Sequence, residues 1–218
     1  MSLLAAYADA TYYQARSSGG TAVRDDAALT EDLTSASRLL ERQLQVAPGA
    51  FNSAAGTRIF NGTGRSILRL RDSAGRQEFL QAVTADKIEI DSNNDGSYDG
   101  YALDLADAWV RGLPENASAH SEPYRALELL GFLSTADPKV WPDRAAVVRI
   151  TGTWGWAAVP ETIRAITVSM TRELRDHFGA GGFGAQERYD EALPLSTQTW
   201  RLIASAKKHY GVRIPAVA

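Results

Sequence analysis

The sequence contains no cysteine among its 218 residues. This absence excludes disulfide bonds, thiol chemistry and cysteine-ligated zinc. The sequence also has no run of about 18 apolar residues, so it predicts no membrane-spanning helix. Its first residues, MSLLAAYADATYYQ, lack the basic start and the long apolar run of a secretion signal. We therefore expect neither a disulfide scaffold, nor a membrane span, nor export.

An excess of positive charge is missing as well. The net charge is -3 and the isoelectric point is near 5.7, so no overall basic field attracts nucleic acid. Hydrophobic residues make up 44% and charged residues 22% of the chain, which is typical of a globular protein with a buried core. The length predicts one domain, or one domain with an inserted subdomain.

Helical periodicity is present near both ends of the chain. Apolar residues recur every three or four positions over residues 25–44 and 160–177, which predicts two amphipathic helices. Shorter helices are expected over residues 3–16 and 196–210. The residues predicted to form the core of a helical bundle are Leu29, Leu33, Leu40, Ile163, Ile166, Met170 and Leu174. The last helix is expected to carry, on one side, Trp200, Ile203, Ala204 and Lys207.

Between these helices, residues 57–154 change to the alternating pattern of strands. TRIFNGTGRSILRL predicts a hairpin around its Asn-Gly turn, and KIEID and YALDL predict a second one around SNNDGSYDG. The order helices, strands, helices predicts an α+β protein that is mainly helical. It would be a single domain, a small helical bundle with a β-rich insertion at 57–154 and an extended tail at 210–218.

The tip of the second hairpin resembles a calcium-binding loop. Asp91, Asn93, Asp95 and Asp99 place oxygen ligands at alternate positions, but Ala102 stands where an EF-hand needs a bidentate glutamate. The flanking segments also alternate like strands rather than helices. A hairpin tip in which Asp, Asn and Gly tolerate positive φ is the preferred interpretation, and a calcium-dependent binding module is the alternative.

No sequence motif indicates an enzyme. The three histidines lie far apart, and neither H-E-x-x-H nor G-x-S-x-G occurs. The run GAGGFG has the glycine spacing of a dinucleotide fingerprint, but it follows a predicted helix instead of a strand. We therefore expect no catalytic residues, no cofactor and no metal, and interpret this run as a mobile or ring-lining loop. Its residues are Gly181, Gly182, Phe183 and Gly184. A hydrolase whose carboxylates meet only in three dimensions stays an alternative.

The segment RITGTWGWAAVPETIRAIT joins the last predicted strand to the third helix. Alternation places Trp154 and Trp156 on the same face, and Pro160 suits a first helical turn. Two large aromatic side chains on one face most often cover a core. One of them, partly exposed near the helix start, is an alternative anchor for another chain.

These residues carry a resemblance to a known family. VRITGTWGWAAVPETIRAITVSMTREL is similar to the signature of head-to-tail adaptor (connector) proteins of long-tailed bacteriophages and gene transfer agents. Those proteins end their β section in V-T-G-x-x-G-W-x-x-V-P and continue into a long helix. The glycine-rich loop after that helix, the early helix and the Asp-Gly-rich hairpin also match in order. Residues 1–17 and 104–145 do not match closely.

The resemblance implies a structural role in the virion neck. Adaptors of this family form rings, usually twelve-fold, that bind the portal protein on one side and a head-closure (stopper) or tail protein on the other. DNA passes through the channel without sequence-specific contact. Such a protein would be made in the cytoplasm of the host bacterium. The C-terminal segment would dock into the portal, which in this chain implicates Tyr210, Val212, Arg213 and Ile214. Head closure or tail completion is the nearest alternative function.

Overall fold

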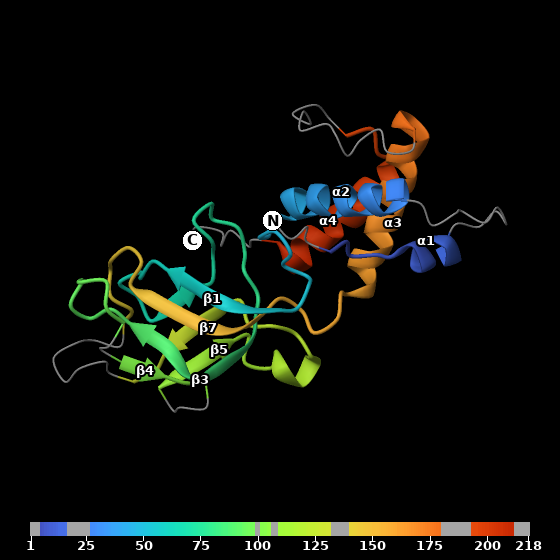
Figure 1. The fold of residues 1–218 in the computed structure, drawn as a ribbon. Coiled ribbons are helices and arrows are strands. Elements are labelled where there is room, and N and C mark those ends of the chain that lie inside the picture. Colours follow the sequence, from blue (N-terminus) through green and yellow to red (C-terminus); the bar gives the residue numbers. More distant parts are fainter. Residues whose placement is uncertain are drawn as a thin grey trace. The chain divides into compact units, whose positions relative to one another are not determined.

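A computed structural model describes residues 5–16, 27–98, 101–105, 109–131, 140–179 and 193–211. The chain divides into two compact units, each made of half of its residues (Figure 1). The α unit comprises Met1–Gly49 and Val159–Ala218, and the β unit comprises Ala50–Ala158. The β unit is therefore continuous in sequence, whereas the α unit is built from both ends of the chain.

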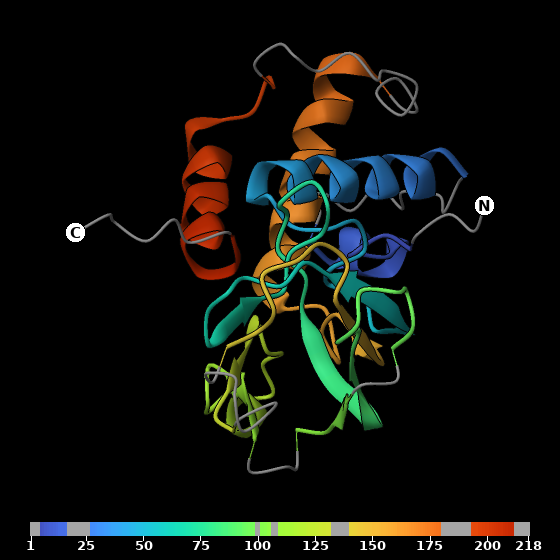
Figure 2. The same cartoon turned by 90° about the vertical axis from the view of Figure 1, so that its left-hand side faces the viewer.

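The described residues of the α unit form four helices: α1 (Ala10–Arg16), α2 (Ala27–Leu44), α3 (Glu161–Phe178) and α4 (Thr197–Tyr210). Figure 2 shows α2 running across α3, with α4 beside them. All seven residues predicted for the bundle core are buried, because the 3.6-residue period places them on the inner side of their helices. No helix among the described residues is long and apolar enough to cross a lipid bilayer.

Two details of these helices differ from the prediction. The first helix begins at Ala10 rather than at residue 3, and the side chain of Asp9 accepts a hydrogen bond from the backbone N–H of Tyr12 (2.7 Å), as a helix cap does. Of the residues expected to share one side of α4, Ile203 is buried, whereas Ala204 and Lys207 are exposed. The buried positions of α4 are Thr199, Ile203, Ala206 and Tyr210.

The β unit contains two antiparallel sheets. The four-stranded sheet has the order β1 (Ala54–Phe60), β7 (Val148–Trp154), β3 (Leu80–Ile90), β4 (Tyr101–Leu103). The three-stranded sheet has the order β2 (Ile67–Arg69), β6 (Ala126–Leu129), β5 (Val110–Leu113), and a short 3-10 helix lies at Ser118–His120. The first and last strands of the unit are neighbours, with Ala54 opposite Trp154.

Inward-facing residues of both sheets form one apolar core. On β7 every second residue is buried, from Val148 through Ile150 and Gly152 to Trp154, as expected for a strand with one face in the core. The other sheet contributes Leu68, Leu127 and Leu129 to the same cluster. The largest side chain of this core is that of Trp141, which is fully buried and donates its indole N–H to the carbonyl of Ser66 (2.9 Å).

The predicted fold class was wrong in one respect: the protein is not mainly helical. Helices hold 35% and strands 24% of the described residues, and the strands build two sheets with a core of their own. The predicted section 57–154 thus lies within a unit that spans half the chain. The unit begins earlier than predicted, because β1 starts at Ala54, before the alternating pattern that was recognised from Thr57.

One predicted hairpin is confirmed and the other is wrong. β3 and β4 pair as expected, with Ile88 opposite Leu103. The segments on either side of Asn61-Gly62, however, do not pair with each other, since β1 pairs with β7 and β2 with β6. Instead of forming a turn, Gly62 donates its N–H to the carbonyl of Arg144 (2.8 Å) and packs so tightly that an added Cβ would lie 1.5 Å from the carbonyl oxygen of Pro142.

Candidate functional site

The Trp-Gly-Trp segment forms the end of the central strand β7. The strand ends at Trp154, and Gly155 then adopts φ +90°, a conformation that L side chains rarely adopt. An added Cβ at Gly155 would lie 2.0 Å from the carbonyl oxygen of Asn52, so only glycine fits. The N–H of Gly155 donates to the carbonyl of Phe79 (2.7 Å). The glycine therefore turns the chain where two other backbone segments approach it closely.

The two tryptophans pack in different groups of aromatic rings. Trp154 lies 5.6 Å from the ring of Phe60 in the core between the sheets, whereas Trp156 packs with Phe51 and Phe79 at 6.3 and 6.0 Å. The prediction that both side chains lie on one face of the strand was wrong, because the positive φ of Gly155 ends the strand alternation. Both are buried, with 2% and 8% of their surfaces exposed, so neither is the partly exposed anchor considered as an alternative.

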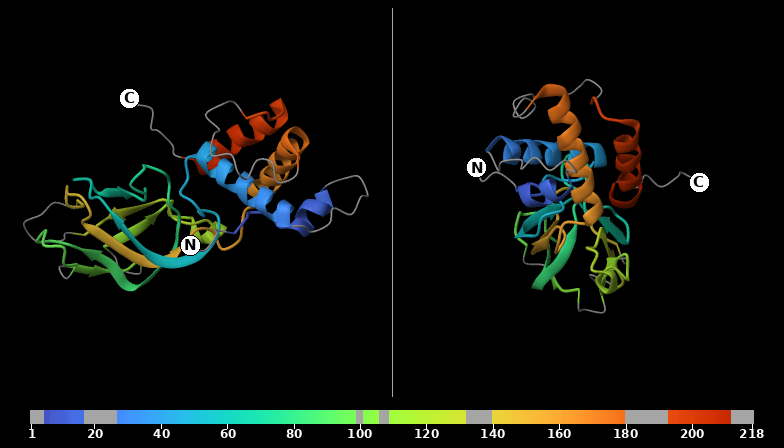
Figure 3. Two further views of the ribbon diagram at one scale, coloured as in Figure 1. Left: turned by 45° about the horizontal axis from the view of Figure 1, so that its top comes forward. Right: turned by 90° about the vertical axis from the view of Figure 1, so that its right-hand side faces the viewer.

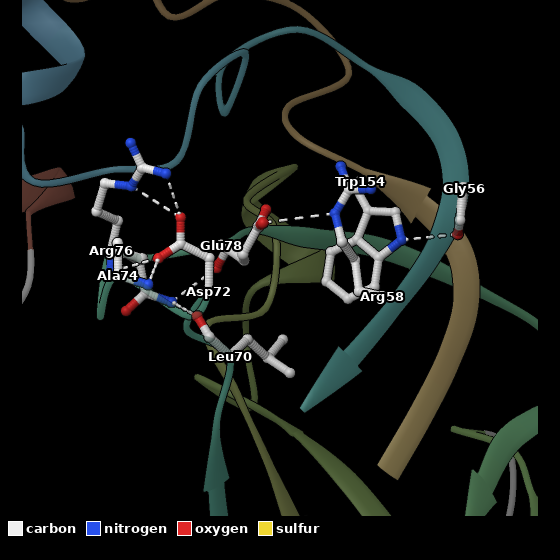
Figure 4. A network of polar contacts seen from close by, with 9 residues as sticks. Gly56, Arg58, Leu70, Asp72, Ala74, Arg76, Glu78 and Trp154 are labelled. Carbon is white, nitrogen blue, oxygen red and sulfur yellow. Dashed lines mark hydrogen bonds and ion pairs between the residues drawn. The ribbon is translucent and has the colours of Figure 1, made fainter. Parts of the chain in front are cut away.

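A network of polar contacts surrounds Trp154 on the inner side of β1 (Figure 4). The indole N–H of Trp154 donates to the carbonyl of Gly56 (2.9 Å), and the Arg58 guanidinium lies 5.6 Å from its ring. Arg58 also contacts the carboxylate of Glu78, with 3.4 Å between its Nε and the nearer oxygen. Arg58 thus joins an acid on one side to an aromatic ring on the other.

Asp72 forms the second part of this network (Figure 4). One of its oxygens accepts the backbone N–H groups of Ala74 and Arg76, both at 2.9 Å, which closes the turn between Leu70 and Glu78. The other oxygen accepts a hydrogen bond from the Arg76 side chain at 2.7 Å. Beside it, the Gln77 amide donates to the carbonyls of Leu70, Glu78 and Arg125. Asp72 therefore serves to fold this turn.

Glu78 has the chemistry closest to that of a functional acid. Burial raises the pKa of its carboxyl and Asp72 adds to the increase, while Arg58 and Arg76 oppose it. A raised pKa marks a candidate proton donor or acceptor. Both carboxylate oxygens of Asp72, however, already accept hydrogen bonds from the turn backbone and from the Arg76 side chain. Asp72 and Glu78 therefore do not form a pair of acids available for proton transfer. The arrangement supports a stable junction between β1 and the segment before β3.

The Asp-rich hairpin tip is organised by Asp91. Its carboxylate accepts the backbone N–H groups of Asn94 (2.6 Å), Asp95 (3.3 Å) and Gly96 (3.0 Å). Burial opposes ionisation of Asp91, but these hydrogen bonds outweigh it and lower the pKa of the carboxyl. Asn94 and Gly96 have positive φ, as predicted for a hairpin tip. The calcium candidate Asn93 belongs to the same tip, and Asp99 lies outside the described residues.

The remaining predicted site residues are placed only in part. Pro160 caps α3, with φ -57° and ψ 139°, and the helix begins at Glu161. Tyr210 is the last residue of α4 and is buried, so it belongs to the helix and not to an extended tail. The other predicted tail and loop residues lie outside the described residues: Val212, Arg213, Ile214, Gly181, Gly182, Phe183 and Gly184.

Sequence patterns missed two acids that organise the α unit. Glu173 on α3 accepts the N–H and the hydroxyl of Ser196 (2.6 and 2.7 Å) and the hydroxyl of Thr199 (2.7 Å). Burial opposes its ionisation, yet these hydrogen bonds lower the pKa of its carboxyl. Glu41 accepts hydrogen bonds from the hydroxyl of Tyr7 and from the N–H of Gly49 (2.6 Å). Of the residues in these contacts, only Ser196 could be identified from the sequence, because a serine directly before a helix is a typical N-cap residue.

The charged clusters of the described residues do not gather metal ligands. Among the residues that the structure places, no three His, Asp or Glu side chains are arranged to hold a metal ion. His120, His177 and His209 lie in three different elements. Comparison with known protein families, with curated proteins and with solved structures finds no match for the chain. The function must therefore be inferred from the chain itself.

Proposed function

We propose that this chain is a structural protein of the virion neck, a head-to-tail adaptor of a tailed bacteriophage or gene transfer agent. In this role it assembles into a ring, binds the portal protein on one side and the head-closure or tail protein on the other, and surrounds the channel through which DNA passes. The proposal rests on the sequence resemblance, which extends over most of the chain. It assigns the protein no enzymatic activity.

The observation that supports the proposal best is the Trp-Gly-Trp junction. The resemblance implies a β section that ends in V-T-G-x-x-G-W-x-x-V-P and continues into a long helix. β7 ends at Trp154, and α3 begins at Glu161 and runs for 18 residues. The two buried tryptophans and the tightly packed Gly155 give this motif a structural reason, because they close the core where the chain leaves the β unit.

The charge of the chain is consistent with this role. A net charge of -3 disfavours tight binding of the DNA backbone, which a channel protein must let pass. The acids with resolved contacts, including Asp72, Asp91 and Glu173, close turns and cap helices. These are the tasks of a scaffold.

The test is portal binding by a chain shortened after Gly211. This truncation keeps α4 intact, because the helix ends at Tyr210, and it removes the tail that the resemblance assigns to the portal. We expect unchanged helix content and thermal unfolding, together with loss of binding to the portal protein encoded in the same genome. A full-length chain with Arg201→Ser, an exposed position of α4 outside the tail, is the control and should bind normally. Equal binding by the shortened chain would refute the assignment of the tail.

Head closure is a second candidate, favoured by one observation. The β unit holds half of the chain and has its own core, which exceeds the insertion that the adaptor resemblance predicts. The two functions differ in the neighbour on the head side: an adaptor binds the portal directly, whereas a head-closure protein binds the adaptor. Binding experiments with each purified neighbour separate them. The adaptor proposal fails if the chain binds only another neck protein of the same genome.

A further inference from the structure

The N-terminal segment, residues 5–16, covers an apolar surface of α2 and α3 (Figure 3). Leu29 and Leu33 of α2 and Val168 of α3 form this surface, and Ala8 and Tyr13 of the segment bury it. Leu29 is fully buried and Leu33 is 1% exposed, so the segment completes a hydrophobic core that the longer helices leave open on this side. We call this surface of α2 and α3 the seat.

Polar contacts fix the direction of the segment at both ends. At its start, the N–H of Tyr7 donates to the Ser37 hydroxyl (3.0 Å), its hydroxyl donates to Glu41, and Arg38 donates to the carbonyl of Ala5 (3.3 Å).

At its end, the Tyr12 hydroxyl and the Arg16 guanidinium both donate to Glu161, the first residue of α3. Arg164 stacks on the Tyr12 ring at 3.8 Å. The seat therefore selects a short segment with a tyrosine and a basic residue four positions later.

The segment is joined to α2 only through residues 17–26. An extended connection of ten residues reaches roughly 35 Å. The contacts at the end of the segment are open to water, since the side chains of Arg16 and Glu161 are 48% and 58% exposed, and exposed ion pairs contribute little to holding two elements together. The segment can therefore leave the seat without breaking the helices that form it.

We propose that the segment is exchanged between copies of this chain, so that residues 5–16 of one subunit occupy the seat of the next. This inference rests on the proposed ring, in which neighbours are held at high effective concentration. Exchange preserves every contact named above, including the pairing of Arg16 with Glu161. Because each subunit has one segment and one seat, donation in one direction joins subunits head to tail, which is the type of contact from which a ring is built when the rotation between neighbours closes.

The absence of cysteine allows a direct test with the full chain. Tyr12→Cys is introduced in one preparation and Glu161→Cys in another, carrying a larger tag. The two are mixed at about 1 mM, an effective concentration typical of tethered partners, incubated and treated with a short bismaleimide. The matched control mixes Glu161→Cys with Arg164→Cys, which lie three positions apart on α3 and report random collision.

We expect a covalent dimer of unlike chains at least about tenfold above the control pair. Exchange is refuted if this dimer stays at the control level while a chain carrying both substitutions cross-links within itself. Arg16→Cys with Arg164→Cys, two positions that flank the Tyr12 ring, repeats the test should the first pair disturb folding. Electron microscopy of the same samples separates failure of the exchange from failure of the proposed function. Rings without cross-links refute the exchange alone. Monomers that also do not bind the portal protein refute the proposed function.

Discussion

The α unit and the β unit are each stabilised internally by a different kind of contact. Helices satisfy their own backbone groups, so the attachment of one helix to another depends on side chains. In the α unit, acidic side chains form some of these contacts between helices. Asp32 of α2 forms an ion pair with Arg175 of α3 (3.5 Å), and Glu173 of α3 accepts hydrogen bonds from the first residues of α4. In the β unit the backbone ladders join the strands, and acids such as Glu89 pair with an arginine of the neighbouring strand.

This difference has a consequence for stability. A contact between helices that relies on an ionised acid weakens when that acid is protonated, whereas a β ladder and an apolar core do not titrate. The packing of helices in the α unit should therefore depend on pH, whereas strand pairing in the β unit should persist when acids such as Glu89 and Asp91 are protonated. The predictions below test this comparison in order of expected effect.

The largest effect is expected in the core of the β unit. Trp141→Ala removes a fully buried ring and its hydrogen bond to Ser66, and should lower the free energy of unfolding by about 3–5 kcal/mol. Denaturant unfolding should show the β unit melting first, with the helical circular dichroism signal retained. Trp109→Ala, at a site that is 47% exposed, is the control and should change little. Simultaneous loss of both units would show that they unfold as one.

A smaller effect is expected at the start of α4. Glu173→Gln replaces two acceptor oxygens by one and should cost about 1–3 kcal/mol. Because the folded pKa of Glu173 is lowered, its contribution is present above the pKa of an unfolded glutamate and is lost as the pH falls through the folded value.

Denaturant unfolding at neutral and acidic pH, followed by circular dichroism, measures this contribution. The wild type should lose more stability on acidification than the variant does. Parallel pH profiles for the two proteins would contradict the assigned role. Glu31→Gln, at an exposed position of α2, provides the control.

The smallest effect is expected at Glu78 of the β unit, whose contribution to stability depends on pH in the opposite direction to that of Glu173. The folded pKa of Glu78 is raised, so its contribution is fully present below the unfolded pKa and is lost as the pH rises through the folded value. Glu78→Gln should remove this loss, so the variant gains relative to the wild type as the pH rises. Thermal unfolding between acidic and neutral pH measures the difference. A wild-type protein stabilised by ionisation of Glu78 would reverse the sign and contradict the prediction.

The sequence predicted the α unit better than the β unit for a physical reason. A helix is a local structure, and seven apolar residues at helical spacing sufficed to identify its buried core. Strand pairing is not local: the partner of β1 lies about ninety residues further along, and Asn61-Gly62 indicated a nearer one. On α4 the sequence pattern did not identify Thr199, which is buried and whose hydroxyl donates to Glu173 of another helix.

The candidate site could be predicted only where its signal was contiguous. The Trp-Gly-Trp segment was identified from the sequence, but the separation of its two rings depends on the φ of Gly155 and on Asn52, a hundred residues away. The hairpin tip was predicted because Asp91 and its donors lie within five residues of each other. Glu173, Arg58 and Glu78 form contacts that no spacing rule relates, so only the structure identifies them.

The pairing of β1 with β7 also makes the β unit a removable module. With Ala54 opposite Trp154, the chain enters and leaves this unit at points separated by one strand spacing, roughly 5 Å. A short turn spans such a gap, so an unrelated domain with adjacent termini can replace the β unit without stretching the helices apart.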